Sequence, residues 1–197
     1  MLQFIQDIIL QISPLEWLGV FFGAIQVILA KQNSVWTYLF GLMSICITII
    51  VYSQVGLYAE VALNGYYLIM SVYGWMYWLR GQGKSETRIT LMTRQETWIA
   101  LGISILGSVF LYYILRHFTN STVPVADAVV SATAWAGMWL MARRKLANWV
   151  FLNISNLIAI PLLWYKALYL YAGLSAFLFV IAVLGYFNWK KIYKSYN

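Results

Sequence analysis

The sequence predicts an all-α integral membrane protein with seven transmembrane helices, in which one helix separates two parallel three-helix repeats. Three observations support this fold class. The composition is 62% hydrophobic and only 10% charged, whereas a soluble domain carries about 25% charged residues. Apolar runs of about the twenty residues that a helix needs to cross a bilayer recur along the chain. Segments of the first three runs also resemble segments of the last three.

The elements can be justified in chain order. Residues 1–13 place aliphatic side chains on one helical face in a stretch too short to span, so we expect an interfacial amphipathic segment. Ser13 and Glu16 predict a capping box at the first span, and Thr93 and Glu96 predict another at the fourth. The spans are expected near residues 14–31, 35–54, 57–79, 95–116, 124–142, 146–165 and 168–189.

The positive charges predict the orientation. With the N-terminus outside, eleven of the thirteen Lys and Arg residues fall on the inner side, and only Arg116 and Lys166 fall outside. The chain should therefore divide into five parts. These are the interfacial segment 1–13, a first repeat 14–79, a cytoplasmic loop and linker helix 80–116, a second repeat 124–189 and a basic cytoplasmic tail 190–197.

The repeat is visible as direct self-similarity. Residues 36–59 align with residues 149–172 without a gap, which matches Trp36 to Trp149. After a two-residue gap, the Gly-x-x-x-Trp motif at 74–78 matches the same motif at 185–189. Both copies begin on the outer side, so the predicted repeat axis lies along the membrane normal, and a site is expected near mid-membrane between the repeats.

The sixth span carries the clearest candidate site. Trp149, Asn153 and Asn156 stand at helical spacing on one face of an apolar run. Hydrocarbon offers an amide no hydrogen bond, so these groups should face protein, water or a ligand. Asparagines can also act only as glue between helices. The indole on the same stripe favours a flat polar heterocycle as ligand.

Two further stripes are candidates. On the third span Glu60, Asn64 and Tyr67 follow the helical period, and on the fifth span Asp127 and Trp135 do so. Either stripe could be packing alone. The acids at or near the outer side are Asp7, Glu16, Glu60 and Asp127. Acids at an outer mouth favour a cationic solute.

Several function classes are disfavoured by the sequence. There is no phosphate-binding Gly-rich loop followed by Lys, no HExxH motif and no Cys/His cluster, so we expect no ATP-driven step, no metal and no cofactor. The single His117 leaves a catalytic Ser or Cys without a partner inside the membrane. The net charge of +7 lies in short loops, which indicates topology and not nucleic-acid binding.

The chain resembles the PnuC family of bacterial vitamin transporters. The likeness rests on LYAEVALNGYYLIMSVYGWMYW after a KQNSVW turn, on ANWVFLNISNLIAIPLLWYKALYLYAGL and on GYFNW, and it covers about residues 15–191. The resemblance implies a three-plus-one-plus-three arrangement related to the SWEET carriers, in the bacterial inner membrane. It also implies facilitated diffusion of an unphosphorylated vitamin that a cytoplasmic kinase then traps.

The vitamin is the open question at this stage. Relatives that carry nicotinamide riboside typically have Asn-Trp-x-x-Trp-x-x-x-Asn on the sixth span, and here Asn148, Trp149 and Asn156 match while Leu152 replaces the second Trp. Because a stacking ring is missing, thiamine is narrowly favoured over nicotinamide riboside; both are cationic heteroaromatic compounds. The expected partners are the vitamin, the bilayer and a possible second copy of the chain. A non-transporting membrane sensor or assembly protein, whose stripes only pack helices, is the alternative from another class.

Overall fold

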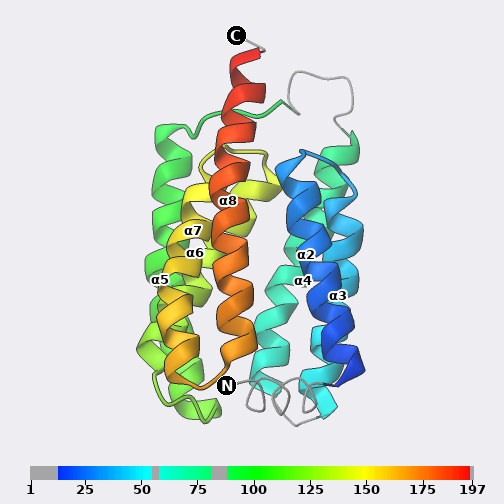
Figure 1. Cartoon of the computed structure of the whole chain (residues 1–197). Helices are drawn as coiled ribbons and strands as arrows, with labels where there is room; N and C mark the ends of the chain where they lie inside the picture. Colours follow the sequence, from blue (N-terminus) through cyan, green and yellow to red (C-terminus); the bar gives the residue numbers. More distant parts are fainter. Residues whose placement is uncertain (1–12, 55–57, 81–87, 196–197) are drawn as a thin grey trace.

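The computed structural model describes residues 13–54, 58–80 and 88–195 (Figure 1). The interfacial segment predicted for the N-terminus lies outside these residues. Seven helices are described, and they all run roughly along one long axis. Their bounds are α2 Pro14–Lys31, α3 Thr37–Gln54, α4 Tyr58–Arg80, α5 Arg94–Phe118, α6 Pro124–Ala142, α7 Asn148–Tyr165 and α8 Tyr169–Ser195.

The helices match the predicted spans closely, with one correction. Both predicted capping boxes are present, since Ser13 and Glu16, and likewise Thr93 and Glu96, exchange side-chain and backbone hydrogen bonds. The basic tail expected from residue 190 is not a separate element, because α8 continues to Ser195. Lysine is a good helix former, so nothing in this stretch ends the helix at the membrane boundary.

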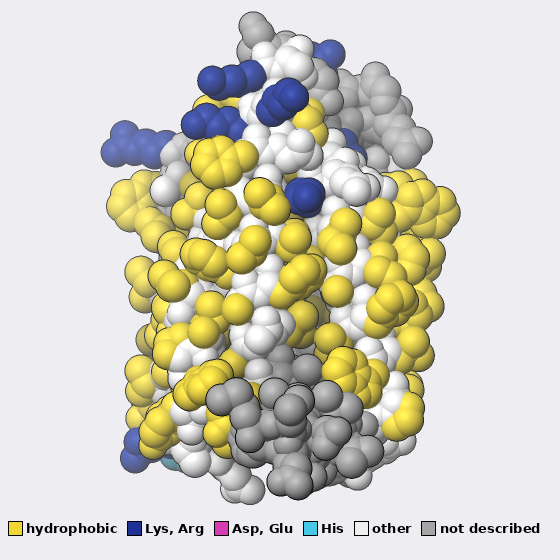
Figure 2. All heavy atoms as spheres, in the orientation of Figure 1, with side chains coloured by type: hydrophobic (Ala, Val, Ile, Leu, Met, Phe, Trp, Pro, Cys, Tyr) yellow, Lys and Arg dark blue, Asp and Glu magenta, His cyan; other side chains and the backbone are white. Residues whose placement is uncertain are grey.

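Five of the seven described helices are long and apolar enough to cross a membrane: α2, α3, α5, α6 and α8. The α4 and α7 helices carry the polar side chains on which the site prediction rests, which lowers their hydropathy. Exposed large apolar side chains cover the outside of the molecule (Figure 2). A surface of this kind is stable against lipid and not against water. The chain is therefore a multi-pass membrane protein.

The helices form two bundles and one additional helix. In the first bundle α3 packs against both α2 and α4, and in the second bundle α7 packs against both α6 and α8. The bundles meet through α2 against α8 and through α4 against α6. The α5 helix packs on the outside of α6 (Figure 1).

The two bundles share their local geometry. The α3 and α7 helices both begin and end 111 residues apart, from Thr37 to Asn148 and from Gln54 to Tyr165. The turn before each contains a residue of positive φ, Asn33 at 57° and Arg144 at 53°, with the same backbone hydrogen bonds around it.

The contacts of the aromatic rings follow the same 111-residue spacing. A Cβ at Gly74 would meet the Tyr38 ring at 2.5 Å, and a Cβ at Gly185 would meet the Trp149 ring at 2.7 Å. The structural counterpart of Trp149 is thus Tyr38, and the predicted match to Trp36 is wrong by two residues. The connections α2–α3 and α6–α7 have equal lengths in the structure, so the gap that we placed later in the alignment is not needed.

One end of the molecule is closed by hydrogen bonds between the bundles. The indole of Trp78 donates to the Ala142 carbonyl at 3.1 Å, and the indole of Trp189 donates to the Ala30 carbonyl at 2.9 Å. Asn188 donates to the Lys31 carbonyl at 2.7 Å. The accepting carbonyls lie in the last turns of α2 and α6, where a helix leaves carbonyls without intrahelical partners. Each bundle therefore caps a helix of the other.

Positive charge marks this same end, which we call the basic end (Figure 2). Ten described Lys and Arg residues belong to the helix ends and turns here, and only Arg116 and Lys166 belong to the opposite end. The Arg144 guanidinium lies 4.0 Å from the centre of the Trp78 ring. Glu96, at the start of α5, forms ion pairs with Arg143 at 3.4 Å and Lys145 at 3.0 Å. These contacts tie α5 to the turn between α6 and α7.

We predict that Trp189→Phe lowers the stability of the purified protein by about 2 kcal/mol, because it leaves the buried Ala30 carbonyl without its donor. Thermal unfolding in detergent measures this change. Trp164→Phe is the matched control, since Trp164 is 65% exposed and Trp189 is fully buried. Equal melting temperatures for the two variants would contradict the role given to the Trp189 bond.

Candidate functional site

A cavity of about 430 Å³ lies between the two bundles. All helices except α5 contribute to its wall, so neither bundle forms the cavity alone. This volume lies within the range of small-molecule sites, and its wall is mostly apolar with a few polar groups, as such sites usually are. The polar residues in the wall are Gln26, Ser44, Tyr67, Ser131, Ser155, Asn156 and Ser175.

The cavity ends at the basic end on a layer of buried side chains. Trp149 lines it there together with Ala30, Met141 and Ala182, and all four belong to the largest buried cluster. The Trp149 ring stands edge-on to Trp189, with 5.5 Å between the ring centres. The close approach of the ring to Gly185 holds it in place, because any side chain at that position would overlap it. Trp149 is thus the floor of the cavity.

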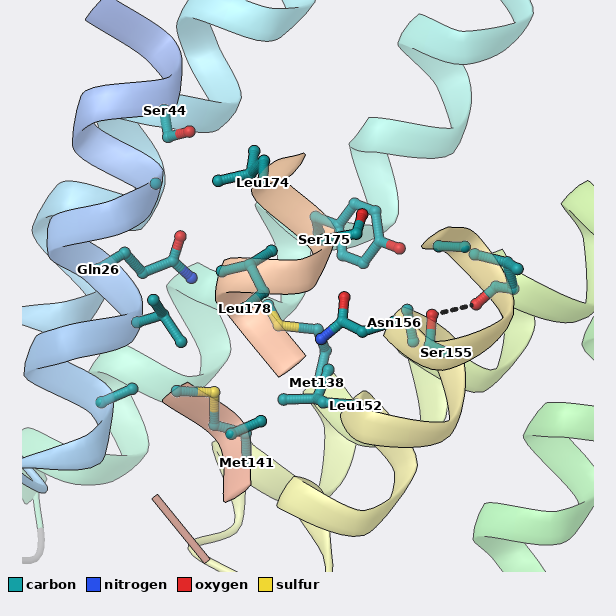
Figure 3. A pocket seen from close by; sticks show the side chains of 18 of the residues that line it. Gln26, Ser44, Met138, Met141, Leu152, Ser155, Asn156, Leu174, Ser175 and Leu178 are labelled. Carbon is teal, nitrogen blue, oxygen red and sulfur yellow. Dashed lines mark hydrogen bonds between the residues drawn. The ribbon is translucent and has the colours of Figure 1, made fainter. Parts of the chain in front are cut away.

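Two side-chain amides project into the cavity from opposite bundles. Gln26 extends from α2 and Asn156 from α7, toward the space beside Leu178 (Figure 3). Within the described part of the chain, neither side-chain amide has a hydrogen-bond partner. The Trp149 indole N–H is also buried without a partner there. Buried polar groups are normally hydrogen-bonded, so these three groups can bind a polar ligand.

Close helix packing sets the positions of two wall residues. The Gln26 amide lies over Gly41, where a Cβ would approach it to 2.9 Å. In the second bundle Leu152 lies against Gly137, where a Cβ would approach it to 2.8 Å. Both members of these pairs are separated by 111 residues, so the long side chain and the glycine exchange helices between the bundles. The result is one polar wall and one apolar wall.

The serines differ in how far they are available. Ser155 donates to the Val130 carbonyl at 2.8 Å, and Ser44 donates to the Gly19 carbonyl at 2.9 Å (Figure 3). Both hydroxyls therefore hold neighbouring helices together. Ser131 and Ser175 line the wall from α6 and α8, and no hydrogen bond of their side chains is present among the described residues. They are the hydroxyls best able to contact a ligand.

The structure brings together three of the residues predicted from the sequence, Trp149, Asn156 and Tyr67. It does not bring Asn153 to them. Asn153 lines a separate groove on the outside of α7 and α8, between Val150 and Phe179. Residues three apart on a helix point about 60° apart, and here that angle separates the cavity from the outer surface. The single stripe predicted for α7 is therefore split.

Four other predicted residues lie outside the cavity wall. Trp36 is 59% exposed. Trp135 stacks on Tyr66 with 4.5 Å between ring centres, and so contributes to the contact between α4 and α6. Asn64 is half-buried and does not line the cavity. The Asp127 carboxylate accepts hydrogen bonds from Lys166, at 2.6 Å, and from Ser121.

Glu60 belongs to α4, but its side chain lies outside the described residues.

Sequence reasoning missed Gln26, Ser131 and Ser175. Gln26 could have been found, because a lone amide within the apolar run 14–31 meets the same criterion that singled out the asparagines of α7. The serines could not, since a serine inside a transmembrane helix can satisfy its hydroxyl on its own backbone. Among the described residues no group of His, Cys, Asp or Glu side chains could hold a metal ion.

A cavity that two helix bundles share inside a multi-pass membrane protein is the architecture of a solute transporter. The family model described as "nicotinamide mononucleotide transporter" matches residues 13–191. The chain belongs to this family, and the resemblance to PnuC proteins is confirmed.

Two relatives and one solved structure illustrate the similarity. The nicotinamide riboside transporter PnuC of Escherichia coli (strain K12) is 22% identical over 184 residues, which cover 80% of this chain and 77% of the relative. The protein of the same name from Neisseria mucosa is 27% identical over 98% of this chain and 79% of the relative. The crystal structure of the vitamin B3 transporter PnuC aligns with a TM-score of 0.74 at 24% identity, over 98% of this chain and 88% of that one. The last comparison shows a common fold.

We predict that Gly185→Ala destabilises the protein by about 1 to 3 kcal/mol, because the new methyl group overlaps the buried Trp149 ring. Gly102→Ala is the matched control: a Cβ at Gly102 meets nothing within 4 Å, so this change should be neutral or slightly stabilising. Thermal unfolding in detergent compares the two variants. A Gly185→Ala protein as stable as Gly102→Ala would show that Trp149 is not held as described.

Proposed function

We propose that this protein carries nicotinamide riboside across the bacterial inner membrane by facilitated diffusion. The observation that carries the proposal is the pair of unpartnered amides, Gln26 and Asn156, facing one cavity from two bundles. Nicotinamide has a carboxamide, and an amide is both donor and acceptor, so two protein amides can hydrogen-bond it from both sides. Ser131 and Ser175 are available for the ribose hydroxyls.

The choice of nicotinamide riboside reverses the narrow preference for thiamine. The relatives are named as nicotinamide riboside transporters, which favours that vitamin. Our preference for thiamine rested on Leu152 in place of a ring and on Asn153 as an added amide. Asn153 lies outside the cavity, and Gln26 supplies an amide instead. The apolar wall at Leu152 and Gly137 remains open to the flat face of a pyridinium ring.

We further propose that residues 14–79 and 124–189 are two parallel repeats, with residues 80–116 as loop and linker helix, related to the SWEET arrangement. The common helix bounds and the common turn geometry support this division. The two bundles then rock about the cavity and expose it alternately to each side. Such a motion needs two states of similar free energy and no energy source.

The orientation in this proposal follows the positive-inside rule, with the basic end in the cytoplasm and the N-terminus outside. In the present conformation the tryptophan hydrogen bonds then close the cytoplasmic side of the cavity. Phosphorylation of the imported vitamin by a cytoplasmic kinase would trap it, because a phosphate cannot leave through an apolar wall.

We predict that proteoliposomes equilibrate labelled nicotinamide riboside without ATP, and that Asn156→Leu lowers initial uptake at least tenfold. The change removes both the donor and the acceptor at nearly constant volume, and leaves polar ligand groups unpaired. Asn153→Leu is the matched control: it is the same substitution on the same helix, but outside the cavity, and it should retain most of the uptake. Equal losses in the two variants would contradict the assignment of the site.

A non-transporting sensor is the second candidate, since the cavity alone would also bind a ligand. Thermal shift cannot separate the two classes, but it identifies the ligand by mass action. We predict that nicotinamide riboside raises the melting temperature in detergent more than thiamine or riboflavin does. A larger shift with thiamine would contradict the choice of vitamin, and binding without any flux would favour the sensor.

A further inference from the structure

We propose that Glu16, Tyr52 and Tyr171 form a vestibule site that recruits the cationic form of the solute on its way to the cavity. The inference rests on the proposed function, including its orientation. It adds a specificity-determining site at the end of the molecule opposite the basic end, and it explains selection for charge that the cavity wall itself does not provide.

The first observation is a second hollow that adjoins the cavity. It holds about 100 Å³, and Gly23, Ser44 and Leu174 line both it and the cavity. From there it follows α2, α3 and α8 toward the start of α2, where Glu16 belongs to its wall. A path therefore leads from Glu16 to the cavity along the contact between the two bundles.

The second observation is the charge of this path. Asp127 lies 111 residues after Glu16, in the first turn of α6, and Lys166 neutralises it. Glu16 forms no ion pair within the described part of the chain. Its Oε2 accepts from the Ser13 amide at 2.8 Å and the Ser13 hydroxyl at 2.9 Å, and its Oε1 has no hydrogen-bond partner among the described residues. The negative charge of Glu16 is thus available to a ligand.

The cavity wall, by contrast, contains neutral residues only. An attraction for positive charge must therefore come from outside it. A carboxylate at the border between solvent and an apolar wall acts through a lower effective dielectric constant than one in bulk water, which strengthens its attraction for a cation.

The third observation is aromatic. Tyr52 of α3 and Tyr171 of α8 line the same hollow as Glu16, and they belong to different bundles. An aromatic face attracts a cation, and it also offers a flat apolar contact to a heteroaromatic ring. A carboxylate and two tyrosine rings together match a positively charged aromatic solute, such as a pyridinium nucleoside, better than a neutral one of the same shape.

The test compares a cationic with a neutral substrate in the full-length protein. Glu16→Gln removes the charge and keeps the capping box, because Gln can also accept at this position. We use labelled nicotinamide riboside, a cation, and dihydronicotinamide riboside, its neutral reduced form. Initial uptake into proteoliposomes is measured below saturation, at low and at high ionic strength, with thermal unfolding as a check of folding.

We expect Glu16→Gln to lower uptake of the cation on the order of fivefold at low ionic strength and to leave uptake of the neutral compound unchanged. High salt should reduce the wild type to the level of the variant. Tyr171→Leu should also lower uptake of the cation more than that of the neutral compound. The double variant Asp127→Asn/Lys166→Gln is the matched control; it removes an acid from the same end at constant net charge and should keep the salt dependence.

The outcomes separate the two proposals. A wild-type protein that does not take up the riboside would overturn the proposed function. A transporting wild type with an equal loss of both substrates in Glu16→Gln, or with no loss of either, would overturn the vestibule site and leave the function standing.

Discussion

The structure depends on two hydrogen bonds in which each bundle caps a helix of the other. Trp78 and Trp189 both donate from the third helix of one bundle to the last turn of the first helix of the other. Both indoles are fully buried, so these bonds are protected from competing water. They hold the bundles together at the basic end only. The space between the bundles toward the other end is thereby left as a cavity that ends on Trp149.

Within this frame, the two bundles have the same architecture but different side chains. The first bundle has Gln26 on α2 above a glycine of α3, and the second has Leu152 on α7 against a glycine of α6. The same close approach of helices thus creates a polar wall on one side and an apolar wall on the other. A ligand that is polar at one edge and flat on its face can use both. An exact repeat could not provide this difference, so the site lies where the two copies diverge.

The sequence predicts the fold better than the site. Helix positions and caps follow from apolar run length and from the Ser13 and Thr93 motifs, which are local and strong signals. The site depends on which way each polar side chain of a helix points, and there the spacing of Asn153 and Asn156 leaves about 60° unresolved. Asp127 was predicted as a free acid, because sequence spacing does not reveal its ion pair with Lys166. Gln26 was within reach of the sequence, but its partner Asn156 lies in the other bundle.

The most direct test of the account is a distance between the bundles at the basic end. Spin labels at Arg80 on α4 and Lys190 on α8, both exposed, report this distance by double electron–electron resonance. If the bundles rock about a shared cavity, the labels should give two distance populations whose ratio changes when nicotinamide riboside is added. A single distance that the riboside does not alter would contradict a carrier mechanism built on the opening and closing of the tryptophan bonds.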